Sequence, residues 1–177
     1  MMSVIKFLAE TGLLAIFLML IGWVFVYKNS RALAKQSEIN AMAAAIEKTL
    51  QEIADENYKF WKDTDDDIKA QLEKSRIFNA YIEYRCNIVE KKIGLLFDKA
   101  KDCLNPAVES SPFTGNSIDL IARIRDRSTM NSEDVSAVRD RYARISAINN
   151  LTLKMFSEIT GFIILRFQPI EEWKFSD

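Results

Sequence analysis

Acidic residues gather in one short stretch of the chain, KDTDDD at residues 62–67. A calcium-binding EF-hand loop places carboxylates in this alternating way, at its first, third and fifth positions. A loop that begins at Asp63 would also need glycine at its sixth position and glutamate at its twelfth, where this chain has Ile68 and Lys74. We therefore predict no metal site here. We interpret the acidic residues as caps and favourable charges at the beginning of a helix.

Histidine is absent, and this restricts the chemistry more than any other feature of the composition. Its absence excludes Ser-His-Asp and Cys-His catalysis and also histidine-ligated metal ions. The sequence contains no phosphate-binding glycine loop, dinucleotide fingerprint or nucleophile elbow. Glu83 and Glu90 fit one face of a helix, but a di-metal bundle site combines such glutamates with histidine. We therefore predict a protein that is not an enzyme and that binds no cofactor.

Arginine is concentrated between residues 123 and 144, where there are six arginines and no lysine. The planar guanidinium group suits phosphate and carboxylate groups, so anionic lipid or a partner protein is one interpretation of this cluster. Carboxylates in the same region make internal salt bridges the simpler interpretation. A net charge of −1 and the absence of a recognition motif argue against nucleic acid. The candidate contact residues are Arg123, Arg125, Arg127, Arg139, Arg141 and Arg144.

The cysteines, Cys86 and Cys103, are seventeen positions apart. On one continuous helix this spacing separates them by roughly 25 Å, which excludes a disulfide within the chain. Two unpaired thiols suit a reducing compartment.

Residues 13–27, LLAIFLMLIGWVFVY, carry no charge, and Thr11 and Gly12 extend the uncharged stretch to the lower limit for crossing a bilayer. We considered a cleaved signal peptide, a buried core helix and a retained membrane anchor. The sequence ALA at residues 32–34 could serve as a cleavage site, but Lys28 and Arg31 precede it and oppose translocation. A core helix is rarely apolar on every face. We predict a transmembrane helix over residues 11–27, after a short tail of residues 1–10.

The orientation follows from the residues that flank this segment. Trp23 and Tyr27 are at its charged end, where an interfacial aromatic belt is expected, and Lys28 and Arg31 complete the set of interface anchors. Basic residues are more numerous after the segment than before it, since Lys35 follows and a single lysine precedes. The positive-inside rule then predicts a single-pass protein of the inner (plasma) membrane, with its N-terminus outside and its C-terminal part in the cytoplasm.

After this segment, apolar residues recur at alternating spacings of three and four, in stretches that begin at Ile39, Ile68 and Val135. This pattern is typical of helices in bundles or coiled coils. Polar residues inside it, such as Asn79 and Thr152, are expected at bundle edges or as register-fixing pairs. We predict an all-α fold, in which the transmembrane helix continues into an elongated antiparallel bundle of three long helices and one short helix. The bundle occupies residues 28–167, with helices at about 28–62, 65–104, 117–127 and 132–167, and a tail at 168–177.

In this topology the second long helix returns to the membrane side, so the arginine cluster is expected beside the bilayer. The features together favour a non-enzymatic, membrane-anchored interaction protein whose partners are the lipid bilayer, another protein or a further copy of itself. Its size and layout are typical of bacterial envelope accessory factors and of prophage or phage-defence proteins that exclude a second phage, although no motif marks a family. A sensory or signalling adaptor and a membrane-disrupting effector remain alternatives.

Overall fold

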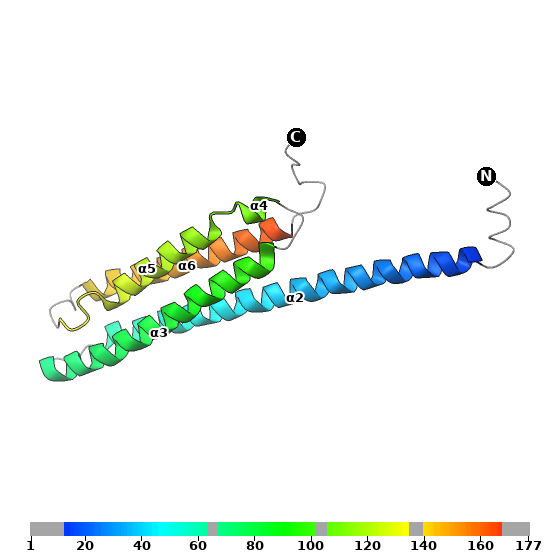
Figure 1. Ribbon diagram of the computed structural model, residues 1–177. Helices are drawn as coiled ribbons and strands as arrows, with labels where there is room; N and C mark the ends of the chain where they lie inside the picture. Colours follow the sequence, from blue (N-terminus) through cyan, green and yellow to red (C-terminus); the bar gives the residue numbers. More distant parts are fainter. Residues whose placement is uncertain (1–12, 64–66, 102–105, 135–139, 168–177) are drawn as a thin grey trace. The chain divides into compact units, whose positions relative to one another are not determined.

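The computed structural model describes residues 13–63, 67–101, 106–134 and 140–167 (Figure 1). These residues form helices and connecting turns, with no strand among them, and the predicted all-α fold is confirmed. The predicted tails at 1–10 and 168–177 lie outside the described residues, as do Arg139 and Cys103. The helices are α2 (Leu13–Lys62), α3 (Ile68–Lys101), α4 (Pro106–Glu109), α5 (Phe113–Thr129) and α6 (Arg141–Arg166).

The chain divides into two compact units, the first ending at Ile39 and the second beginning at Asn40. Helix α2 passes through this boundary without interruption, as expected from the lack of helix-breaking residues between 23 and 62. In the first unit every described residue from Leu13 to Ala34 is exposed. The apolar segment is long and hydrophobic enough to cross a membrane, and none of its most apolar window is buried within the chain.

The second unit is a helical bundle in which residues 40–62 of α2 pack antiparallel to α3. The Nζ atom of Lys92 donates to the carbonyl oxygen of Ala45 at 3.1 Å. Further along, Arg85 pairs with Glu52 at 2.9 Å. At the far end, the rings of Phe60 and Phe78 stack with 3.9 Å between their centroids. Rising residue numbers on α2 therefore meet falling numbers on α3, which confirms the predicted antiparallel hairpin.

Helix α5 is a full member of the bundle, where the sequence indicated only a short helix at 117–127. It begins four residues earlier and has 17 residues. Its buried side alternates apolar residues with small serines: Phe113, Ser117, Ile121, Ile124 and Ser128. Because two of these five buried residues are serines, the spacing of apolar residues alone did not mark this side of the helix as buried. Ser117, where the sequence indicated that the helix would begin, is fully buried one turn inside the helix.

Helix α6 begins at Arg141 and not at Ser132 as predicted. Asn131 has a positive φ of 55°, a turn conformation that asparagine tolerates, and the chain bends there after α5. The Ser132 hydroxyl donates to Asn79 Oδ1 at 3.0 Å, and the Ser132 carbonyl accepts from Gln71 Nε2 at 2.9 Å. Ser132 therefore ties the α5–α6 connection to α3 and caps no helix.

The bundle thus has four antiparallel members: the second half of α2, then α3, α5 and α6. Figure 1 shows α5 and α6 side by side, and Phe113 of α5 stacks on Phe162 of α6 with 4.1 Å between centroids. The α5–α6 pair is antiparallel, because Asn116 near the beginning of α5 donates to Glu158 near the end of α6 at 3.3 Å. Because α5 runs along the bundle, α6 begins beside Trp61 at the end of α2 and runs back from there.

Candidate functional site

The candidate arginines that the structure describes, Arg123, Arg125, Arg127, Arg141 and Arg144, do not form one cluster. Arg123 pairs with Asp119 on its own helix at 2.9 Å, and both side chains are more than half exposed. Arg125 forms an ion pair with Glu90 of α3 and donates to Asn87 at 3.2 Å. These two arginines lie along the middle of α5 with partners inside the chain, as the salt-bridge interpretation predicts for them.

Arg144 has a structural role at one end of the bundle. Its guanidinium lies 4.2 Å from the centroid of the Trp61 ring and donates to the carbonyl oxygens of Arg127 and Met130. A cation at this place satisfies carbonyls that the end of α5 leaves unpaired. Burial lowers the pKa of Arg144, and the like charge of Arg127 lowers it further, while Asp140 opposes the shift. Arg141 lies over the Tyr142 ring at 5.1 Å from its centroid.

The sequence predicted the arginine cluster beside the membrane because the second long helix was expected to return to the membrane side. The chain enters the bundle at Asn40, whereas Arg127 and Arg144 lie beside Trp61, where α2 ends. Because α5 runs the length of the bundle, the arginines extend from its middle to the end away from Asn40. Lipid contact by these arginines stays a prediction.

The interface anchors predicted from the sequence, Trp23, Tyr27, Lys28 and Arg31, all lie on α2 in the first unit and are all exposed. The Trp23 side chain is 75 % exposed and Tyr27 is 61 % exposed. None of the four side chains packs in the core of the bundle, so all four can contact groups outside the chain.

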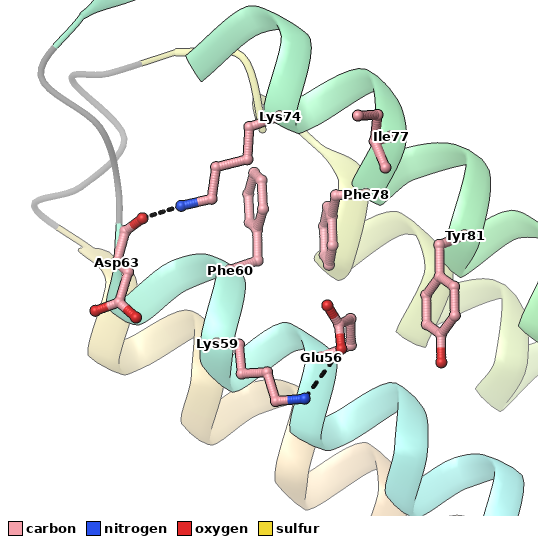
Figure 2. A pocket seen from close by; sticks show the side chains of 8 residues that line it. All are labelled: Glu56, Lys59, Phe60, Asp63, Lys74, Ile77, Phe78 and Tyr81. Atoms are coloured by element: carbon pink, nitrogen blue, oxygen red, sulfur yellow. Dashed lines mark hydrogen bonds and ion pairs between the residues drawn. The ribbon is translucent and has the colours of Figure 1, made fainter. Parts of the chain in front are cut away.

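A pocket of about 360 Å³ lies between the end of α2 and the beginning of α3 (Figure 2). The stacked rings of Phe60 and Phe78 line it, and Ile77 and Tyr81 extend the apolar wall along α3. The charged lining residues are Glu56, Lys59, Asp63 and Lys74.

The charged side chains of this pocket pair with one another or with the backbone. Lys59 pairs with Glu56 at 3.4 Å, and Lys74 Nζ donates to the backbone carbonyl of Asp63 and lies 5.8 Å from the Phe60 ring centroid. The lining offers no nucleophile beside a base, which acyl or phosphoryl transfer would need. Across the described part of the chain, no group of three carboxylates and cysteines could hold a metal ion. An apolar side chain of another protein is the kind of group that this pocket suits.

Asp67, the last residue of the acidic stretch, caps the beginning of α3, as predicted. The carboxylate of Asp67 accepts a hydrogen bond from the backbone N–H of Lys69 at 3.0 Å. This bond satisfies one of the unpaired donors at the beginning of α3.

Cys86 is fully buried, and burial raises the pKa of its thiol to about 11, although the nearby guanidinium of Arg125 opposes the shift. At pH 8 only about one thiol in a thousand is then ionised. We expect the Cys103→Ser protein to give no reaction with a disulfide reagent such as DTNB while it is folded, and one equivalent after guanidinium unfolding. Rapid labelling of the folded protein would contradict this burial.

Comparison with known proteins places this chain in no family: no family model, no curated protein and no solved structure matches it.

Proposed function

We propose that this chain is a non-enzymatic, single-pass membrane protein whose helical bundle lies in the cytoplasm and acts by binding other protein surfaces. The observation that carries the proposal is the exposure of the apolar first part of α2, from Leu13 to Tyr27. A helix of a soluble core buries its apolar residues, but here the bundle builds its core without them. Exposing fifteen consecutive uncharged residues to water is costly, and a bilayer removes that cost.

The flanking residues support a retained anchor over a cleaved signal. Lys28, Arg31 and Lys35 follow the segment at spacings of three and four, and therefore share one face of α2. Anionic headgroups on the cytoplasmic side of a membrane attract basic residues at this place. Trp23 and Tyr27 lie at the depth where aromatic side chains prefer the interface.

Exposed apolar side chains on the surface of the bundle support the binding role. Apolar side chains remain exposed on the outer face of α3, including Ile77, which is 68 % exposed at the edge of the pocket. Single exposed apolar residues are ordinary, but a continuous row beside a pocket is typical of interaction sites.

Reporter fusions test the proposed orientation. We expect a green fluorescent protein fused after Asp177 to fluoresce and an alkaline phosphatase at the same place to be inactive, because the basic flank holds the C-terminal part in the cytoplasm. Replacing Lys28 and Arg31 by glutamine removes most of the charge bias and should give a mixed orientation. An active phosphatase fusion in the unmodified protein would refute the cytoplasmic bundle. Collapse of the membrane potential on expression would favour the effector alternative.

A further inference from the structure

The outward face of α6 carries no charged residue, although 28% of the residues in the whole chain are charged. Seven exposed residues follow one another along this face at spacings of four, three and four, repeated once. We call them the α6 row: Tyr142, Ser146, Asn149, Leu153, Ser157, Thr160 and Ile164. Their mean spacing of about 3.7 is close to the 3.6 residues of a helical turn, so the row runs almost straight along the helix.

The α6 row presents large uncharged side chains where a bundle surface is ordinarily charged. Tyr142 is 75 % exposed, Leu153 is 59 % exposed and Ile164 is 60 % exposed, and the half-buried Phe156 lies beside them. The outer face of α3, by contrast, carries exposed charges such as Lys91. Depletion of charge together with aromatic and apolar side chains is typical of the centre of a protein interface. The α6 row is therefore suited to contact with another protein surface.

Helix α6 has a different neighbour on each side of the row. On one side is α5, where Lys154 lines a pocket together with Asp119. On the other side is α2, because α3 contacts both α2 and α5 and so lies diagonally opposite α6. Glu47 is five residues before Glu52, which pairs with α3, and so lies about 140° around α2 from it, on the side of α6. Neither Lys154 nor Glu47 has an ion-pair or hydrogen-bond partner among the described residues.

We propose that the α6 row is covered by the same row of a second copy of this chain, with the two α6 helices parallel about a two-fold axis that runs along them. Each member then meets its own counterpart, Leu153 on Leu153 and Ile164 on Ile164. The amide of Asn149 both donates and accepts hydrogen bonds, so the two copies of this residue pair with one another and fix the register. Because no member of the row is charged, this self-pairing creates no like-charge contact.

The charges beside the row favour parallel over antiparallel pairing. A two-fold axis along the helices brings the α5 side of one copy to the α2 side of the other, so Lys154 of each copy faces the side that carries Glu47. Antiparallel pairing over the same row turns about its middle residue, Leu153, and brings the two α5 sides together. The two Lys154 side chains, one residue from that midpoint, would then face one another, which is unfavourable.

Parallel pairing also agrees with the membrane anchor, and this part of the argument rests on the proposed function. Asn40, where the bundle begins, follows Tyr27 by thirteen residues of the uninterrupted α2, or about 20 Å. Two copies anchored in one bilayer therefore hold the Asn40 ends of both bundles near the same membrane surface. A parallel pair keeps these ends together, whereas an antiparallel pair would place them at opposite ends of the dimer.

Cysteine cross-linking in detergent micelles tests this pairing, because two copies are then free to take either relative orientation. The full chain carries Cys103→Ser and keeps the buried Cys86. We expect Ser146→Cys protein and Thr160→Cys protein each to form a cross-linked dimer alone on mild oxidation, whereas Ala80→Cys, at an exposed position of α3, forms none. Antiparallel pairing would hold two copies of residue 146 about 21 Å apart, so that only a mixture of the two α6 variants cross-links. That pattern would overturn the parallel pair, and no cross-link in any α6 variant would overturn the dimer.

Analytical ultracentrifugation provides a second measurement. Leu153→Lys places two cations against one another at the middle of the row, and we expect it to weaken dimerisation at least tenfold. The matched control, Leu95→Lys, adds the same charge on α3 at a similar exposure, 56 % against 59 %, and should leave the dimer unchanged. Equal dimerisation of the two variants would overturn the α6 interface. Flotation with lipid is measured on the same proteins and should not change for either, so failure of the dimer and failure of the membrane anchor are distinguishable.

Discussion

Replacing Ile16 and Leu20 together by arginine is expected to move the protein from the membrane fraction to the soluble fraction. Each arginine at the centre of a spanning helix costs about 2.5–3.5 kcal/mol on insertion scales, and the uncharged segment is close to the minimum spanning length. The insertion cost of two such charges exceeds the favourable transfer free energy that the remaining apolar residues of the segment supply. The measurement is the fraction that resists alkaline carbonate extraction and floats with lipid.

The matched control places two arginines at Leu153 and Ile164 on α6. These residues are 59 % and 60 % exposed, and Leu20 is 59 % exposed, so the controls add the same charge at the same exposure. We expect the control protein to stay in the membrane. Retention of the Ile16→Arg, Leu20→Arg protein would refute the anchor. An intact mass below 20.4 kDa would show that the segment is cleaved.

The same pair of substitutions should leave the bundle folded. The side chains from Leu13 to Ala34 are exposed, so none supplies the buried contacts of the second unit. Far-UV circular dichroism should show the helix content of the bundle unchanged. Loss of the membrane fraction together with loss of helicity would indicate misfolding and would not support the anchor.

The second large effect is expected at Trp61, and it concerns stability. Trp61 is 1 % exposed, its ring meets Phe60 edge-on with centroids 5.0 Å apart, and Arg144 lies 4.2 Å from its centroid. Trp61→Ala should lower the free energy of unfolding by about 3–5 kcal/mol, because it leaves a large cavity where α2 meets α6. Urea unfolding in detergent, followed by circular dichroism, measures this change.

Trp61→Phe is the matched control. The indole Nε1 has no hydrogen-bond partner among the described residues, so removing it breaks no bond there. Phenylalanine keeps an aromatic face for Arg144 and fills part of the volume. We expect it to cost less than half of the alanine effect. Equal losses for both variants would show that the indole nitrogen makes a contact that the packing alone does not explain.

The sequence predicted the elements with strong apolar periodicity. The hairpin of α2 and α3 follows from two long stripes separated by a short acidic turn. The buried residues of α3 from Ser75 to Ala100 keep the expected spacing almost throughout. Antiparallel packing then requires no further information, because a short connection allows no other direction.

The prediction was less accurate after residue 105. The buried stripe of α6 passes through Ile148, Met155 and Phe162. Tyr142, which continues the spacing of three and four that begins at Val135, is 75 % exposed. Apolar residues surround much of this helix, so periodicity did not identify its buried side. Asn79, expected at an edge or in a register-fixing pair, accepts a hydrogen bond from Ser132. No local pattern links residues so distant in the chain.

The sequence alone determined that the chain is helical, that its first apolar segment is long enough to span a bilayer, and that histidine-dependent chemistry is absent. These properties depend on composition and on spacing along a single helix. Only the tertiary structure decided that α5 belongs to the bundle, that the described arginines are dispersed over it, and that apolar residues such as Ile77 stay exposed on the outer face of α3. Each of these depends on which face of a helix is buried, and that is decided by neighbours that the chain brings together only when it folds.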